Sequence, residues 1–284
     1  DYVMMFKILI LQKLFHISDA QAQYQINDRL SFMRFLGQHL YDTVPDEKTI
    51  WHFREQLVKS NMMDTLFYRF IHTLEEKGII TLNGSIVDAT FVDKPKQRNS
   101  REENDDIKNG KTPDEWNDEK NKHKKAQKDV DTRWAKKNDE THYGYKDHVK
   151  VDKDSKIIVE YSVTPANVHD SQELGNLIDI EKDKVIYGDS AYTGEDVTEC
   201  LGAVENRIHE KGYRNKPLTK SQLKRNKKKS KIRARVEHVF AYMTNTMKGI
   251  TIRSVGLIRA RVQVALMNLT YNMCRYIFLK GLKT

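Results

Sequence analysis

Two aspartates are placed where a sheet protein can hold a metal ion. Asp88 and Asp189 each follow a short apolar run, at 86–87 and 186–188, and such runs are typical of buried strands. A carboxylate at the end of a strand is costly to bury unless it pairs with a cation, and open α/β sheets keep ligand sites at the carboxyl ends of their strands. Each aspartate alone is more often a turn former or a helix cap, but the two together favour one shared site.

A glutamate on a predicted helix is the third candidate. The pattern predicts a helix over 231–248, because core-facing side chains recur there at helical spacing: Val236, Val239, Phe240, Met243 and Met247. Glu237 lies on the adjoining stripe together with Arg233. One interpretation is an exposed ion pair four residues apart, worth about 0.2–0.5 kcal/mol. The other is that Glu237 points at the same site as the two aspartates.

Three carboxylates without cysteine or clustered histidine ligands form a hard oxygen site, which suits Mg²⁺ or Mn²⁺ rather than structural zinc. Two such ions about 3.5–4 Å apart activate water or a 3′-hydroxyl for in-line attack on a phosphodiester and stabilise the leaving oxygen. The chemistry predicted from Asp88, Asp189 and Glu237 is therefore metal-dependent cleavage or transfer of a nucleic acid strand.

The charge of the chain supports a polyanionic partner. The 284 residues include 49 Lys and Arg and 40 Asp and Glu, which gives a net charge of +9 and a pI near 9.2. From 211 to 235 there are 12 basic residues and no acidic ones, so the rest of the chain has a slight negative excess. One interpretation of this block is a solvated flexible loop. We favour contact with DNA phosphates, because charges of one sign repel each other without a counter-charge. The expected contacts are Lys227, Lys228, Lys229, Lys231, Arg233 and Arg235.

Several classes of protein are excluded. Only two cysteines occur, Cys200 and Cys274, so the chain is not a disulfide-stabilised secreted domain. The longest apolar stretch, at 3–15, is shorter than the roughly 20 residues that span a bilayer. We expect a cytoplasmic protein with no membrane partner and no secretory signal.

The elements that position the carboxylates follow from periodicity. Residues 1–83 predict a helical N-terminal domain, for dimerisation or DNA-end binding. Residues 84–284 alternate strands and helices, with a strand at 85–92, a hairpin over 143–163 and two long helices from 231 onward, separated near 249–256. This order predicts an α/β core with an antiparallel hairpin beside its first strand, wrapped by C-terminal helices.

A charged segment interrupts this core at about 93–140. It holds 27 charged residues in 48 positions, and Trp116 and Trp134 are nearly its only large apolar groups. Such a composition buries too little apolar surface to order itself unaided. We therefore expect a mobile insertion.

Short strings in a shared order carry a family resemblance. They are Val44-Pro45-Asp46, Val87-Asp88-Ala89-Thr90, His142-Tyr143-Gly144-Tyr145-Lys146, Thr164-Pro165-Ala166-Asn167-Val168-His169-Asp170, Gly188-Asp189-Ser190-Ala191-Tyr192 and Arg235-Val236-Glu237. Over nearly its whole length the chain resembles bacterial insertion-sequence DDE transposases of the insertion-sequence-five type, which are related to the insertion-sequence-four group.

The resemblance implies an RNase H-like mixed sheet in which Asp88, Asp189 and Glu237 are the catalytic triad and bind two Mg²⁺ or Mn²⁺ ions. It implies cleavage of double-stranded DNA at element ends and joining of the 3′-hydroxyls to target DNA, by a homodimer or larger assembly. Two rivals stay open: an RNase H-like nuclease that cuts without joining, and a catalytically inactive DNA-binding derivative.

The helix of the glutamate departs from the related pattern Y-x2-R-x3-E-x6-K. Arg233 and Glu237 match it, but Ser230 stands at the Tyr position and Thr244 at the Lys position. Lys248, one turn later on the expected helix, is a candidate substitute for phosphate contact. His169 and Asp170, within a shared string, are possible accessory residues, although a histidine in a loop is more often structural.

Overall fold

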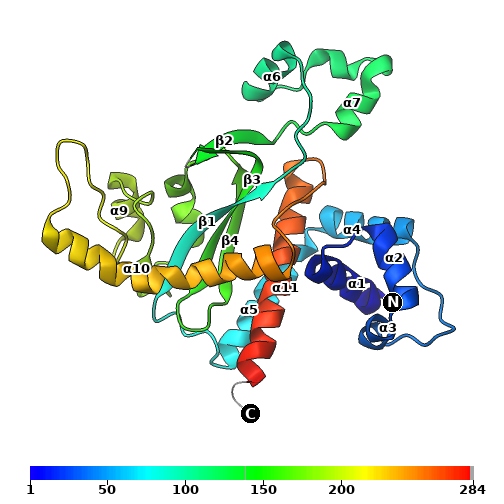
Figure 1. The fold of residues 1–284 in the computed structure, drawn as a ribbon, viewed down its shortest axis with the longest axis horizontal. Helices are drawn as coiled ribbons and strands as arrows, with labels where there is room; N and C mark the ends of the chain where they lie inside the picture. Colours follow the sequence, from blue (N-terminus) through cyan, green and yellow to red (C-terminus); the bar gives the residue numbers. More distant parts are fainter. Residues whose placement is uncertain (138, 282–284) are drawn as a thin grey trace.

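A computed structural model describes residues 1–137 and 139–281 (Figure 1). The chain opens with five helices and continues into a sheet that is flanked by further helices. The opening helices are α1 (Tyr2–Phe15), α2 (Asp19–Asp28), α3 (Leu30–Leu36), α4 (Glu47–Ser60) and α5 (Met62–Glu76). The helical character predicted for residues 1–83 is thus observed.

Caps set the bounds of these helices. Ser18 and Asp46 accept backbone hydrogen bonds from Gln21 at 3.2 Å and Thr49 at 2.7 Å, and so begin α2 and α4. Arg29 adopts an extended backbone, which separates α2 from α3. Gly37 ends α3 with φ of 80°, a left-handed conformation that glycine accepts readily.

The sheet is mixed, and β1 is near its centre. Its strands are β1 (Ser85–Asp93), β2 (Arg133–Lys137), β3 (Glu140–Asp152), β4 (Ile158–Pro165), β5 (Val185–Tyr187) and β6 (Glu205–Asn206). β1 pairs antiparallel with β3 and parallel with β5, while β4 and β2 pair antiparallel with β3 and β6 pairs parallel with β5. The predicted first strand and the hairpin beside it are confirmed.

Side chains on the two faces of β1 enter different hydrophobic clusters, because successive strand residues point in opposite directions. Ile86 packs in a large cluster with residues of α10 (Lys220–Ala241) and α11 (Leu257–Gly281). Val87 packs in a smaller cluster with α8 (Leu174–Leu177) and α9 (Glu195–Leu201). Asp88, two residues after Ile86, therefore belongs to the face that α10 covers.

The helix α11 joins the two parts of the chain. It contacts α1, α4 and α5 on one side and β4 on the other, and Figure 1 shows it between the sheet and the opening helices. Its central residues from Val264 to Asn272 are all buried, as expected of a helix packed on several sides. None of the helices in the described parts of the chain is long and apolar enough to cross a membrane.

The basic block lies on a helix rather than in a loop. The helix α10 begins at Lys220, 11 residues earlier than predicted, because Thr219 and Gln222 form a reciprocal capping box. It ends at Ala241 and continues into a π-helical turn, Tyr242–Thr246. The α-helix predicted to run to Lys248 ends at Ala241, and the π-helical turn that follows it ends at Thr246, so Lys248 lies just beyond the helical segment.

The charged insertion contains order that its composition did not predict. It forms α6 (Arg101–Lys108), two 3₁₀ turns (Asp114–Asn117 and Glu119–Asn121) and α7 (Lys122–Gln127). Trp116 is fully buried, and its indole Nε1 donates to Glu103 Oε1 at 2.7 Å. Lys124 and Lys128 donate to the same carboxylate at 3.0 and 2.8 Å. One aromatic ring and one multiply bonded carboxylate thus replace the large apolar core that the segment lacks.

Replacing Glu103 by Ala is expected to loosen this insertion while the rest of the chain stays folded. Burial opposes ionisation of Glu103, but the bonds from Lys128 and Trp116 outweigh it and lower its pKa to about 2. Loss of these charged hydrogen bonds removes about 1.5–3 kcal/mol of local stability. Amide hydrogen exchange over α6 and α7 measures this loss. Glu102→Ala, an exposed change on the same helix, is the matched control, and equal protection in both variants would contradict the assignment.

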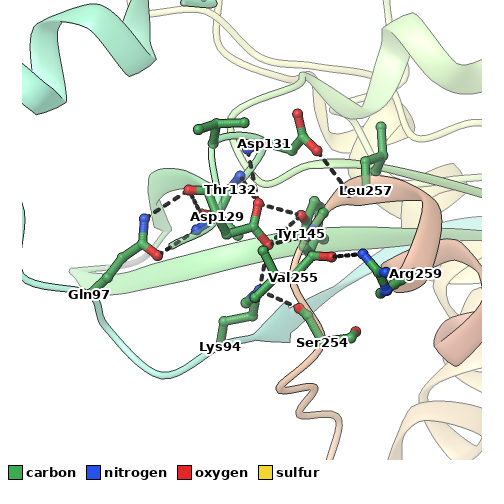
Figure 2. A network of polar contacts seen from close by, with 12 residues as sticks. Lys94, Gln97, Asp129, Asp131, Thr132, Tyr145, Ser254, Val255, Leu257 and Arg259 are labelled. Atoms are coloured by element: carbon green, nitrogen blue, oxygen red, sulfur yellow. Dashed lines mark hydrogen bonds and ion pairs between the residues drawn. The ribbon is translucent and has the colours of Figure 1, made fainter. Parts of the chain in front are cut away.

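A buried carboxylate anchors the insertion to α11 (Figure 2). Asp129 accepts hydrogen bonds from the Tyr145 hydroxyl at 2.8 Å and from the Gly256 backbone at 2.9 Å, and it pairs with Lys94. Asp131 accepts from the first backbone amide of α11, at Leu257, at 2.8 Å. Burial alone would raise the pKa of Asp129, but the bond from Lys94 and the backbone donors lower it. The ends of the insertion are therefore fixed, and the expectation of a mobile segment is not met there.

A second buried carboxylate limits stability at neutral pH. Asp147 on β3 is fully buried and accepts one bond, from Asn268 Nδ2 at 3.2 Å. Burial raises its pKa well above 3.8. Above that value the unfolded chain ionises Asp147 freely, whereas the folded chain holds the proton or buries a charge. The contribution of Asp147 to the free energy of unfolding therefore falls as the pH rises from about 4 towards neutrality.

Asp147→Asn should increase the free energy of unfolding at neutral pH by about 1–3 kcal/mol. The amide removes the ionisable group and places a donor next to Asn268 Oδ1, which has no partner among the described residues. Urea unfolding at acidic and neutral pH measures the difference, and the gain should shrink at the acidic value. A variant less stable than wild type at both pH values would contradict this prediction.

Candidate active site

The sheet brings the two candidate aspartates together. Strands β1 and β5 run parallel with Ser85 opposite Ile186 and Ile86 opposite Tyr187. This register, continued by two residues, sets Asp88 opposite Asp189 just beyond the end of β5. Asp88 is 8% exposed, and Asp189 is partly buried. Neighbouring carboxyl ends of parallel strands thus form the floor of the candidate site, as the sequence predicted.

The two aspartates differ in their surroundings. Burial raises the pKa of Asp88 to about 6; a backbone bond from Ala89 and the charge of Arg233 oppose this rise, and the charge of Asp189 adds to it. Asp189 Oδ1 accepts from the backbone of Ala191 at 2.8 Å, which fixes the carboxylate at the start of a turn. Its second oxygen accepts no hydrogen bond from the parts of the chain that the structure describes. Two repelling carboxylates with a free oxygen are suited to hold a cation.

The helix α10 contributes an arginine between the carboxylates. Arg233 Nη1 donates to Asp88 Oδ2 at 2.8 Å, and Nη2 donates to Glu237 Oε1 at 3.1 Å. The ion pair predicted between Arg233 and Glu237 is therefore present, and the same guanidinium reaches the strand aspartate. The side chain of Glu237 is 62% exposed. Glu237 thus lies beside the site and is connected to Asp88 through Arg233.

The donor set fits a cation but is not arranged as a finished metal centre. Among the described residues, no three His, Cys, Asp or Glu side chains are grouped so that they could hold a metal ion. The guanidinium of Arg233 instead takes the place of a cation between Asp88 and Glu237. These oxygen ligands suit Mg²⁺ or Mn²⁺. All three carboxylates can converge on such an ion only if Arg233 moves away from them.

Two residues beside the carboxylates were not among the predicted site residues. Lys146 donates to Asp170 Oδ1 and to the Val168 carbonyl, both at 2.7 Å. Tyr192 is fully buried, its hydroxyl has no partner within the described chain, and burial and the charges of Asp88, Asp170 and Asp189 raise its pKa. Both residues lie within the strings that carry the family resemblance, and this position was the sequence signal that could have identified them.

The two accessory candidates, His169 and Asp170, have different surroundings in the structure. Asp170 is buried and paired with Lys146, and its charge acts on Tyr192 at the site. His169 is exposed, and its Nδ1 accepts from the backbone of Ser171 at 3.3 Å, which caps the short turn Asp170–Glu173. His169 therefore has a local structural role in this structure, whereas Asp170 belongs to the surroundings of the site.

The basic candidates also divide into two groups. Lys227, Lys228 and Lys231 are exposed on α10 and make no hydrogen bond or ion pair with the described residues. Lys229 donates to the Ile208 carbonyl at 2.7 Å, and Arg235 donates to the Lys153 carbonyl at 2.6 Å. These two side chains fasten the helix to the sheet, so their assignment to DNA contact is not supported by their present partners.

Lys248 is not on the same helix face as Glu237, where it was expected. It follows the π-helical turn with a left-handed backbone, and its charge lowers the pKa of His16 at the end of α1. It therefore lies near the opening helices and does not replace the missing lysine of the helix pattern.

Comparisons with protein families give two matches. A family model described as a transposase DDE domain matches residues 81–273, more than half of the chain. A second, described as a transposase domain (DUF772), matches residues 1–56. No solved structure matches the chain. The first match contains all three candidate carboxylates.

Proposed function

The chain belongs to the family of transposase DDE domains and acts in transposition, and from this premise we propose that it cleaves phosphodiester bonds at the ends of a DNA element and joins the 3′-hydroxyls to target DNA. The observation that carries the proposal is the position of Asp88 and Asp189 at adjacent strand ends, with Glu237 brought beside them by α10. The strand order supports an RNase H-like core, with Asp88 on the first strand and Asp189 after the fourth strand of the core when β2 of the insertion is set aside.

Each residue has a role in this proposal. Asp88, Asp189 and Glu237 hold two divalent ions, which when bound supply activation of the attacking oxygen and stabilisation of the leaving one. Arg233 leaves the carboxylates and binds a phosphate of the DNA, because a guanidinium suits bidentate contact with phosphate. Lys146 holds Asp170, whose charge acts on Tyr192 beside the acidic cluster. Catalysis thus requires a rearrangement of Arg233 on binding DNA.

The exposed lysines of α10 give the helix an affinity for the DNA backbone. Lys227, Lys228 and Lys231 have no acidic partner in the parts of the chain that the structure covers, so each can neutralise a phosphate and release a counterion. We place the protein in the insertion-sequence-five type on the shared strings. Since two element ends must meet, we further propose a dimer or larger assembly, with residues 1–83 contributing to pairing or end recognition.

The test is a strand-cleavage and strand-transfer assay with Mg²⁺ or Mn²⁺ on DNA that carries the element ends. Wild type should nick at the ends and join pre-cleaved ends to a second duplex. Glu237→Gln should abolish both reactions and leave DNA binding intact. Cleavage without joining would favour an RNase H-like nuclease, and undiminished activity of Glu237→Gln would remove this residue from the mechanism.

One observation favours a second function, an inactive DNA-binding derivative. The pairing of Arg233 with both Asp88 and Glu237 neutralises two of the three carboxylates. If this state persisted on DNA, the protein would bind without cutting. Binding with no metal-dependent nicking of element ends would support that alternative over the transposase.

A further inference from the structure

A second strongly basic region lies away from the carboxylates, in a cleft of about 760 Å³. Its walls come from three parts of the chain: the opening helices α1 and α4, the loop 251–255, and the helix α11. Ala126 on α7 of the insertion also borders it. The cleft is therefore the junction of the N-terminal helices, the insertion and the C-terminal helix.

The charge of the cleft is unbalanced. Of its four basic side chains, Arg54 pairs with Asp19 and Arg259 pairs with Glu55 at 2.7 Å. These are the two acidic side chains of the wall. The remaining two, Lys13 and Arg253, form no ion pair or side-chain hydrogen bond with any residue that the structure describes. With Lys13 protonated, the cleft thus keeps an excess of two positive charges.

Lys13 is the most informative of these cations. It is partly buried, and burial followed by the charge of Arg54 lowers its pKa to about 7, while Asp19 opposes the change. Burial and the charges of Lys13, Arg253 and Lys248 likewise lower the pKa of His16. Lys13 on α1 and the two cations of the loop after α10 thus all act on the His16 ring. Burying an ammonium group without a counter-charge is unfavourable, so Lys13 readily loses its proton near neutral pH, and an anion in the cleft would favour its charged form.

The neutral groups of the wall suit a hydrogen-bonding anion. Ser254 has a buried hydroxyl with no partner among the described residues, and this hydroxyl can rotate to donate. His16 Nε2 lies 3.3 Å from the Thr251 hydroxyl and connects α1 to the loop across the cleft. Trp51, 47% exposed, is the single aromatic side chain of the wall. Such a lining offers donors to oxygen and little stacking surface for a base.

We propose that this cleft binds a phosphate group and that the source of the phosphate is the backbone of DNA. The inference rests on the proposed function and adds a second contact surface to it. Lys13, Arg253 and Ser254 supply the charge and the donor. Contact with phosphate positions a duplex without reading its sequence.

The position of the cleft supports DNA over a free nucleotide. Ile250 and Ile252, beside the cleft loop, exchange backbone hydrogen bonds with Asp93 at 3.1 Å. Asp93 is five residues beyond Asp88 on β1, a separation of about 17 Å along the strand. This is shorter than one helical turn of DNA, about 34 Å. The strand segment that links Asp88 to the cleft loop is therefore short enough for one duplex to span.

The experiment measures the binding of a labelled duplex of arbitrary sequence at several salt concentrations. Lys13→Met keeps the buried stem and removes the charge, and Arg253→Gln removes the second charge. Each should weaken binding several-fold and reduce the slope of log K against log salt by about 0.9. Lys77→Gln, an exposed change after α5, removes one charge outside the cleft and should leave the slope unchanged. Thermal unfolding of each variant verifies that it is folded.

Three outcomes decide the matter. A smaller slope in both cleft variants supports the proposal, and slopes equal to wild type in folded variants overturn it. Titration with ATP and pyrophosphate forms the second arm: if these ligands bind in a Lys13-dependent way while the duplex slope is unchanged, the assignment to DNA is overturned in favour of a free phosphate ligand. Failure of the proposed function is separate, because it appears as absent metal-dependent cleavage by wild type whatever the slopes show.

Discussion

Asp189→Asn is expected to reduce metal-dependent cleavage by at least about 10³-fold. The amide can still accept the backbone bond of Ala191, so the turn after β5 should remain intact. The substitution removes the negative charge that makes the second carboxylate oxygen of Asp189 a ligand for a hard cation. Since Asp189 makes no ion pair within the described chain, loss of its charge leaves no cation unpaired. The variant should therefore fold and bind DNA as wild type does.

The matched control is Asp196→Asn, an exposed change of the same charge on α9, seven residues along the chain. Cleavage of end-bearing DNA is measured beside binding of the same duplex, with Mg²⁺ and again with Mn²⁺. Activity of Asp189→Asn within a few-fold of the control would show that the chemistry lies elsewhere. Because Asp88 would then stand alone at the strand ends, the triad as a whole would have to be given up.

The strands were predicted well because their signal is local. The run at 85–92 is apolar and β-branched and follows a turn, and it forms β1 with these bounds extended by one residue. The bounds of α10 were missed because its first half is almost entirely polar. No apolar stripe marks Lys220 to Ser230, and the capping box at Thr219 is the one local signal of the start.

The insertion shows where composition misleads. Its 27 charged residues predict a mobile segment. One of them, Glu103, instead accepts hydrogen bonds from the indole of Trp116 and from two lysines. Which carboxylate of 13 would be buried depends on tertiary pairing, and a sequence pattern contains no information about that. The ends of the insertion are fixed in the same way by Asp129.

The sequence predicted which acidic residues belong to the candidate site but not how their side chains are arranged. Two aspartates at strand ends follow from the pattern, because parallel strands place their carboxyl ends at one edge. The spacing of Arg233 and Glu237 predicted a pair on one helix face. That Arg233 also reaches Asp88 depends on how α10 crosses β1, and a contact between residues 145 positions apart cannot be read from spacing. The burial of the Tyr192 hydroxyl without a partner among the described residues is likewise a property of the packed fold and not of a local pattern.

Arg233→Gln should have opposite effects on metal binding and on cleavage. Without DNA, the guanidinium neutralises Asp88 and Glu237 and competes with any other cation for them. Its removal should tighten Mn²⁺ binding by about 5–10-fold, equivalent to about 1–1.4 kcal/mol. The measurement is made at about pH 8, well above the ordinary range of a carboxyl pKa, since loss of Arg233 also favours the protonated form of Asp88. Titration calorimetry or the electron paramagnetic resonance of Mn²⁺ reports it directly.

Cleavage by the same variant should fall by about 10²-fold, because the phosphate would lose the side chain that positions it. Lys231→Gln, which removes one exposed charge from the same helix, separates this effect from the general attraction of α10 for DNA. Slower cleavage with unchanged Mn²⁺ affinity would show that Arg233 acts only in DNA contact. If neither the cleavage rate nor the Mn²⁺ affinity changed, Arg233 would have no role in the site. Tighter metal binding combined with slower cleavage requires two positions of one guanidinium, on the carboxylates before DNA arrives and on the phosphate afterwards. Such exchange would couple assembly of the metal site to the presence of the substrate.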